Sequence, residues 1–272
     1  MSPASSDSDQ GPAPHGQDTP WGSRERASAA GAGLEGTAGR AHGRPHFQQQ
    51  LQELEERALG GLDLVIEQLE RVERALADQD IALAEIVIAD DDRIDGRYME
   101  VHQGILSLLA LQAPVAGDLR LVAALLHVLK SLERMGDQCV NIAKLIPLSG
   151  HHPPVREELL SRLLRMSKCA RTQVAQAKAA FATRDVALAE DLVRRDREIN
   201  ALNREIFRLA LEAGEDSDTR EWGMHMILAA RALERVGDNA VDIGEQVVFV
   251  VTGLFSEFSD SSHPLGPQRR QS

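Results

Sequence analysis

Two stretches of this 272-residue chain occur twice, and this internal repeat restricts the possible folds more than any other feature. Residues 80–85, DIALAE, return as residues 185–190, DVALAE, shifted by 105 positions. Residues 132–137, LERMGD, return as residues 233–238, LERVGD, shifted by 101 positions. The difference between the two shifts falls in a turn between two expected helices. A period of about 100 residues predicts two copies of one supersecondary unit.

Hydrophobic residues in the first copy recur every three or four positions, which is the period of an amphipathic helix. Three helices are predicted, the first beginning at Pro45 and ending near residue 78, the second over 81–112 and the third over 115–146. The apolar stripes of these helices consist of Leu51, Leu54, Ala58, Leu62, Val65, Leu69, Val72 and Leu76, then of Val87, Ile94, Tyr98, Val101, Ile105 and Leu108, and finally of Leu125, Leu129, Leu132, Gly136, Cys139, Ala143 and Ile146.

The composition supports helices packed through aliphatic side chains. Only 3% of the residues are aromatic, whereas 43% are hydrophobic. Sheet proteins are enriched in aromatic and β-branched residues, so this balance argues against a sandwich or a barrel. Short connections make consecutive long helices antiparallel neighbours. We expect an all-α protein with six long helices, arranged as two tandem three-helix bundles related by a pseudo-two-fold axis.

The two ends of the chain differ from the middle. Residues 1–44 hold 8 of the 21 glycines, and Leu34 is their only large aliphatic residue after Met1. Such a segment cannot bury enough apolar surface to offset its ordering entropy. We expect disorder there and in the polar residues 256–272. The first bundle is then expected over residues 45–148 and the second over 149–255.

Charge and cysteine content exclude several classes of protein. The net charge of −12 argues against a nucleic-acid partner or an anionic membrane surface. No apolar run approaches the roughly 18 residues of a spanning helix, so no transmembrane segment is expected. The two cysteines, Cys139 and Cys169, do not form a disulfide framework, and the N-terminus does not read as a signal peptide. These features predict a cytoplasmic protein.

Carboxylates stand where the predicted second helix should be apolar. Asp91 interrupts the stripe, and Asp95 follows one turn later on the same face. On the third helix, Glu133 and Asp137 lie four residues apart. In an antiparallel hairpin that turns at Pro114, the two pairs lie at the same height, because they are equally far from the turn. Like charges gathered in this way require a cation or protons.

The second copy repeats most of this arrangement. Asp196, Glu234 and Asp238 correspond to Asp91, Glu133 and Asp137, whereas Asn200 stands where the first copy has Asp95. Oxygen ligands suit magnesium, manganese or iron, and the lack of histidine in the motif argues against a typical zinc site, although zinc stays among the candidate ions.

A solvated alternative remains open for these carboxylates. Glu133 and Asp137 could simply be surface residues paired with Lys130, Arg134 or Arg120. No phosphate-binding loop, dinucleotide fingerprint or Ser/His/Asp arrangement is present, so no catalytic residues are predicted. Three function classes therefore stay open: a regulatory adaptor, a metal-dependent phosphohydrolase or oxidase, and a plain helical scaffold.

Residues 110–120, ALQAPVAGDLR, followed by residues 132–143, LERMGDQCVNIA, resemble the PhoU family, whose members accompany the phosphate-specific ABC transporter of bacteria. The resemblance covers residues 46–254 and implies two three-helix bundles. It also implies a metal-binding E(D)-x-x-x-D motif in each half. The matching positions are Glu133, Asp137, Glu234 and Asp238, with Asp91, Asp95 and Asp196 as acidic partners on the preceding helix. Asn200 departs from the acidic pattern.

The same resemblance implies a non-enzymatic function. Members of the family hold phosphate uptake and the phosphate-starvation regulon in a repressed state. The implied partners are the ATPase subunit of the phosphate transporter and a sensor histidine kinase. These partners would bring a cytoplasmic protein to the inner face of the membrane. We also expect a homodimer.

Overall fold

The structure is a computed structural model that describes residues 36–111, 114–212 and 216–258. Within these ranges the chain forms α-helices and no strand, which confirms the expected all-α class. The helices are α1 (Gly36–Asp78), α2 (Ile81–Ala89), α3 (Asp91–Leu111), α4 (Ala116–Leu148), α5 (Glu157–Thr183), α6 (Val186–Leu211) and α7 (Ser217–Thr252).

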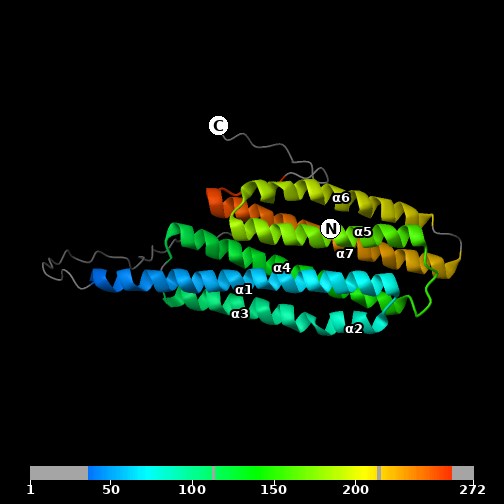
Figure 1. The fold of residues 1–272 in the computed structure, drawn as a ribbon, viewed down its shortest axis with the longest axis horizontal. Helices are drawn as coiled ribbons and strands as arrows, with labels where there is room; N and C mark the ends of the chain where they lie inside the picture. The colour runs from blue at the N-terminus through cyan, green and yellow to red at the C-terminus, as the bar shows by residue number, and fades with distance from the viewer. Residues whose placement is uncertain (1–35, 112–113, 213–215, 259–272) are drawn as a thin grey trace, which may run out of the picture.

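The helices lie side by side along the long axis of the molecule, with α1–α4 below α5–α7 in the view of Figure 1. Helix α4 packs on α7, and α1 packs on α5. These pairs join equivalent helices of the two copies, because the shift of about 100 residues carries α1 onto α5 and α4 onto α7. The two copies therefore meet through their own counterparts, as the expected pseudo-two-fold arrangement requires.

The predicted apolar stripes form the core. Every stripe residue of α1 and α4 is buried, and so are the stripe residues of α2 and α3 except Tyr98, which is half-buried. Phe181 is the largest fully buried side chain, and the rest of the core is mainly aliphatic. Burying these side chains stabilises the fold by about 25 cal/mol for each Å² of apolar surface removed from water.

The expected second helix is divided into α2 and α3, which together take the place of one of the six predicted long helices. Asp90 separates α2 from α3, which continues along nearly the same line (Figure 1). The N–H of Asp90 still donates to the carbonyl of Ile86, but its carbonyl accepts from Arg93, only three residues on. Three consecutive aspartates, residues 90–92, have low helix propensity, which explains a break at this point.

The start of α1 also differs from the prediction. The helix begins at Gly36 rather than at Pro45, which lies inside it. The segment between these two residues holds alanine and arginine, which favour a helix, but also Gly39 and Gly43, which disfavour one. An interior proline also disfavours a helix, because it removes a backbone donor and clashes with the preceding turn, so helix propensity does not explain the earlier start. Residues 1–35, for which disorder was expected, lie outside the described residues.

Beyond α7 the chain folds back on the helix. The ring of Phe255 stacks on Phe249 with 4.1 Å between centroids. The N–H of Phe258 donates to Glu245 Oε1 at 2.7 Å, and its ring packs against the core. The expected disordered tail therefore does not begin at residue 256, and residues 259–272 lie outside the described residues. None of the described helices has an apolar stretch long enough to cross a membrane.

Candidate functional site

The predicted carboxylates of the first bundle meet where α3 faces α4. Asp91 is the first residue of α3, and Gly136 lies opposite it on α4. A Cβ atom at Gly136 would lie 3.1 Å from Asp91 Oδ1 and 3.1 Å from the end of Ile94. The missing side chain of Gly136 thus leaves the space that the Asp91 carboxyl occupies. This contact lies at the height that was predicted from the equal distances of the two helix segments from the turn at Pro114.

The carboxylates of this site act on one another electrostatically. Burial raises the pKa of Asp91 to about 6, and the negative charges of Asp95 and Asp137 add to the effect. Partial burial of its carboxyl also raises the pKa of Asp137, together with the charges of Glu133 and Asp95. Lys144 opposes both shifts. The four predicted residues therefore form one interacting group, which favours binding of a cation or of protons.

Nearby cations neutralise part of this group. Lys130 Nζ lies 2.8 Å from Glu133 Oε2, one turn away on α4. Arg71 on α1 pairs with Asp90, directly before the site. The solvated alternative fits Glu133, which pairs with Lys130, and Asp137, which is exposed. It does not describe Asp91, which is half-buried and has a raised pKa.

The second copy differs from the first mainly in Asp196 and its neighbour Asn200. Asp196 on α6 is only 3% exposed, and its Oδ2 accepts a hydrogen bond of 2.7 Å from Asn200 Nδ2. A Cβ atom at Gly237 would lie 3.0 Å from Asp196 Oδ1, so the close approach to a glycine is repeated. Glu234 pairs with Arg231 on the same helix and Asp238 is exposed, as Glu133 pairs with Lys130 and Asp137 is exposed in the first copy. A buried hydrogen-bonded pair therefore replaces the repelling carboxylates of the first bundle.

The sequence analysis missed two glutamines beside these sites. Gln173 on α5 is fully buried, donates to the carbonyl of Leu192 at 3.3 Å, and places Oε1 3.2 Å from the Cβ position of Gly237. Gln68 is its counterpart on α1, 105 residues earlier. Among the described residues, neither polar atom of the buried Gln68 side chain has a hydrogen-bond partner. The sequence does contain a signal for these two residues, because a glutamine next to the apolar stripe recurs after the repeat shift of 105 residues.

The donor set of the first bundle fits a hard cation, because it contains only oxygen. Gly136 provides space beside Asp91, and burial, with a smaller contribution from neighbouring carboxylates, raises the pKa values of Asp91 and Asp137. Over the described ranges, however, no three His, Cys, Asp or Glu side chains lie close enough together to hold a metal ion. Binding would require the carboxylates to turn toward one another, and the metal stays a prediction.

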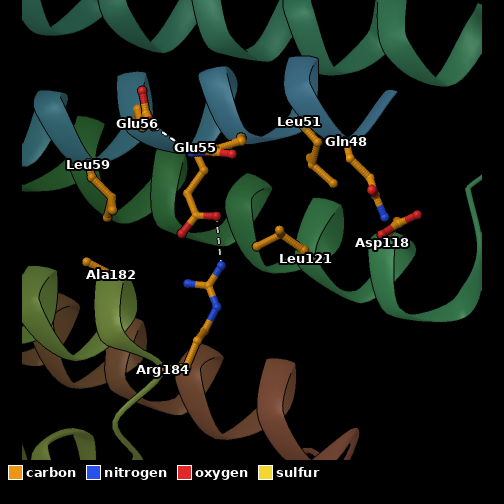
Figure 2. Close-up of a pocket in the computed structure, with 10 residues that line it drawn as sticks. Gln48, Leu51, Glu55, Glu56, Leu59, Asp118, Leu121, Ala182 and Arg184 are labelled. Carbon is orange, nitrogen blue, oxygen red and sulfur yellow. Dashed lines mark hydrogen bonds and ion pairs between the residues drawn. The ribbon is translucent and has the colours of Figure 1, made fainter. Parts of the chain in front are cut away.

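A cavity of about 510 Å³ lies where the two bundles meet, between α1, α4 and the turn from α5 to α6. Figure 2 shows Arg184 reaching from this turn to Glu55 on α1, with 2.7 Å between Nη2 and Oε2. Glu56 and Asp118 also line the cavity, and Glu56 accepts a hydrogen bond from Gln52. The ion pair across the cavity fastens the second bundle to the first.

The PhoU domain, as a sequence family, matches this chain twice, over residues 62–146 and again over residues 163–247. The two matches are equally long and lie in the two bundles. This chain belongs to the PhoU family. The double match confirms that the repeat read from the sequence is a repeated PhoU domain.

Individual relatives agree with this assignment. The chain is 33% identical to the phosphate-specific transport system accessory protein PhoU homolog 1 of Mycobacterium tuberculosis over 192 residues, which cover 68% of this chain and 84% of the relative. It is 29% identical over 219 residues to the PhoU homolog of Clostridium acetobutylicum, covering 79% of this chain and 98% of that protein.

Solved structures of PhoU proteins have the same fold. The PhoU structure from Streptococcus pneumoniae superposes with a TM-score of 0.72 at 27% identity, covering 78% of this chain and 99% of that protein. The PhoU structure from Pseudomonas aeruginosa gives a TM-score of 0.69 at 29% identity, with 76% and 100% covered.

Proposed function

We propose that this PhoU-family chain is a regulatory adaptor of phosphate homeostasis that restrains phosphate uptake and the phosphate-starvation regulon. The observation that carries the proposal is the PhoU domain present in both bundles. Relatives that align over most of their length are named accessory proteins of the phosphate-specific transport system. The output of such a protein is contact with partners rather than turnover, and it acts in the cytoplasm.

The proposed partners are the ATPase subunit of the phosphate transporter and a sensor histidine kinase. Large apolar side chains are exposed on both sides of the turn between α3 and α4, including Leu106, Leu111 and Leu119. Phe207 and Leu211 are exposed at the end of α6, before the equivalent turn of the second copy. Exposed apolar groups at equivalent turns favour docking of partners or of a second copy of the chain.

The proposed metal ligands are Asp91, Asp95, Glu133 and Asp137, which would hold a divalent or trivalent ion in the first bundle. The raised pKa values of Asp91 and Asp137 support this, because a bound cation would relieve the repulsion between their carboxylates. Binding in the second bundle would be weaker. Asn200 supplies no negative charge there, and its amide already donates to Asp196.

Deletion of the gene tests the regulatory proposal. The deletion strain should express phosphate-starvation genes and accumulate phosphate although phosphate is plentiful. The full chain, and a variant that lacks residues 1–35, should both restore repression, because these residues precede α1 and both PhoU matches. A co-purification from phosphate-replete cells should recover the transporter ATPase.

The opposite result would favour the metal-dependent enzyme. Normal phosphate regulation in the deletion strain, together with metal-dependent phosphoester hydrolysis that is lost in Glu133→Ala/Asp137→Ala, would overturn the adaptor. The same double variant separates the two functions. If the protein is an adaptor, the double variant changes expression of a phosphate-starvation reporter. If the protein is an enzyme, the double variant loses phosphoester hydrolysis.

A further inference from the structure

A groove of about 350 Å³ runs between α5 and α6 on the second bundle, and none of its lining residues is one of the predicted metal ligands. It is lined by Arg165, Lys168, Cys169, Thr172, Arg195 and Glu198. Three of these residues are cationic and one is anionic. The groove therefore has a local charge of +2, in a chain whose net charge is −12.

Neighbouring carboxylates neutralise the cations of this groove only in part. Arg165 Nη2 lies 2.7 Å from Glu198 Oε1, a close ion pair. Arg195 Nε lies 3.6 Å from Asp191 Oδ2, which is too long for a hydrogen bond. Lys168 takes part in no ion pair within the described part of the chain and is exposed. Positive charge is therefore available to a ligand.

The equivalent surface of the first bundle has the opposite sign. The repeat shift of 105 carries Asp63 onto Lys168. It likewise carries Glu67 onto Thr172 and Asp90 onto Arg195. The positive groove is therefore not a property of the repeated helical frame. It arises from side chains that only the second copy has at these positions.

We propose that the groove between α5 and α6 binds the phosphate group of an anion. A phosphate group carries between one and two negative charges at neutral pH, which matches the local charge of +2, whereas a carboxylate carries one. Guanidinium groups present paired donors that suit phosphate oxygens, and Lys168 adds an ammonium group. Thr172 Oγ1 already donates to the carbonyl of Lys168 at 2.8 Å, so the donors to the anion are the three cations.

Cys169 provides a local reporter. Its side chain lines the groove, and its pKa is raised by burial and by Glu198, whereas Arg165 and Arg195 oppose the shift. The other cysteine of the chain, Cys139, is fully buried in the core. A thiol reagent applied to the folded protein therefore labels Cys169. An anion in the groove would cover this thiol and slow its reaction.

The test titrates the full-length protein with inorganic phosphate, ATP and acetate, following heat release and the rate of Cys169 labelling. We expect phosphate or ATP, but not acetate, to bind and to slow the labelling, and added salt should weaken the binding. Tighter binding of ATP identifies a nucleotide as the source of the phosphate group, and tighter binding of phosphate identifies the free ion. Lys168→Gln should weaken binding by about tenfold, the loss of one charge-assisted contact.

Arg208→Gln is the matched control, because Arg208 lies on α6, is exposed and pairs with Glu212 outside the groove. It should leave binding and labelling unchanged. The assignment is independent of the proposed regulatory function, since it concerns a different surface and an in vitro titration. Labelling of Cys169 that phosphate and ATP leave unchanged, or equal weakening by Lys168→Gln and Arg208→Gln, would overturn the proposal.

Discussion

In each bundle an aspartate lies against a glycine of the facing helix, but the surroundings of the aspartate carboxyl differ between the two bundles. In the first bundle Asp91 is half-buried, and its pKa is raised to about 6 by burial and by the carboxylates of Asp95 and Asp137. In the second bundle Asp196 is almost fully buried and accepts a hydrogen bond from Asn200. The first site gathers carboxylates whose charge Lys130 and Lys144 relieve only in part, and the second site supplies a hydrogen-bond donor from its own helix.

A single position accounts for much of this difference. Asp95 and Asn200 occupy equivalent places, one turn after the aspartate that both copies share, and differ only in a carboxylate oxygen replaced by an amide nitrogen. The carboxylate raises the pKa of its neighbour, whereas the amide donates to it. Duplication of a fold therefore leaves room for the two copies to diverge in chemistry without a change in helix packing.

The largest expected effect on stability is that of Asn200→Asp, which places an aspartate in the second site where the first site has Asp95. The substitution removes the amide donor to Asp196 and places a second carboxylate beside a buried one. We expect a loss of about 3 kcal/mol in unfolding free energy at pH 7, measured by urea denaturation. Asn203→Asp, one turn later and less buried, is the control and should change stability by less than about 0.5 kcal/mol. Equal effects of the two substitutions would contradict the comparison.

The next largest expected effect is a dependence of folding stability on pH, caused by Asp91. The folded-state pKa of Asp91 lies near 6 and the ordinary aspartate value near 3.8, so the folded state binds this proton more tightly than the unfolded state. Asp91 therefore lowers stability as pH rises from about 4 to above 6, by about 2 kcal/mol, a value reduced from about 3 kcal/mol to allow for solvent screening of this half-buried group. In the presence of a chelator, Asp91→Asn should match wild type below pH 4 and be more stable than wild type at pH 7. A pH-independent difference between the two proteins would show that the carboxyl is not perturbed.

Replacing the glycine at each site by alanine is expected to have a smaller effect on stability. In Gly237→Ala the new methyl group meets the buried Asp196 and Gln173 at 3.0 and 3.2 Å, so we expect a net loss of about 1 kcal/mol in calorimetric stability. In Gly136→Ala the half-buried Asp91 can move toward solvent, and only the buried Ile94, 3.1 Å from the new methyl group, must adjust, so the net cost should be smaller once the gain in helix propensity is included. Gly96→Ala, where nothing lies within 4 Å, should stabilise the protein and serves as the control. A larger loss at Gly136 than at Gly237 would reverse the comparison.

The smallest effect is expected from Asp95→Asn, which gives the first site the amide of the second. Removing one like charge from an exposed position should stabilise the metal-free protein by about 0.5 kcal/mol, less at high salt. The measurement is thermal unfolding at two ionic strengths. Destabilisation that salt does not alter would mean that Asp95 contributes a structural hydrogen bond rather than repulsion.

Much of the fold could be predicted because aliphatic side chains determine it. The stripe from Leu51 to Leu76 has the period of a helix, and burial follows from that period. The start of α1 at Gly36 and the break at Asp90 could not be predicted in the same way. Helix ends depend on single capping contacts and on tertiary partners such as Arg71, which pairs with Asp90.

The candidate site could be predicted in position but not in detail. Equal distances from the turn at Pro114 placed Asp91 opposite Gly136, since antiparallel helices rise equally along both arms of a hairpin. The contact of Glu133 with Lys130 depends on side-chain rotamers, which the spacing of residues does not define. Gln68 was missed because a polar residue beside a stripe is ordinarily exposed, whereas here it is buried.

Calorimetric titration of the purified, metal-free chain with Mn²⁺ tests the difference between the two sites most directly. The account predicts one dominant site per chain, lost in Glu133→Ala/Asp137→Ala and retained in Glu234→Ala/Asp238→Ala. Asp95→Asn should weaken this site, because it removes a carboxylate ligand. Binding that is equal in all of these proteins, or that is lost only when Glu234 and Asp238 are replaced, would contradict the account.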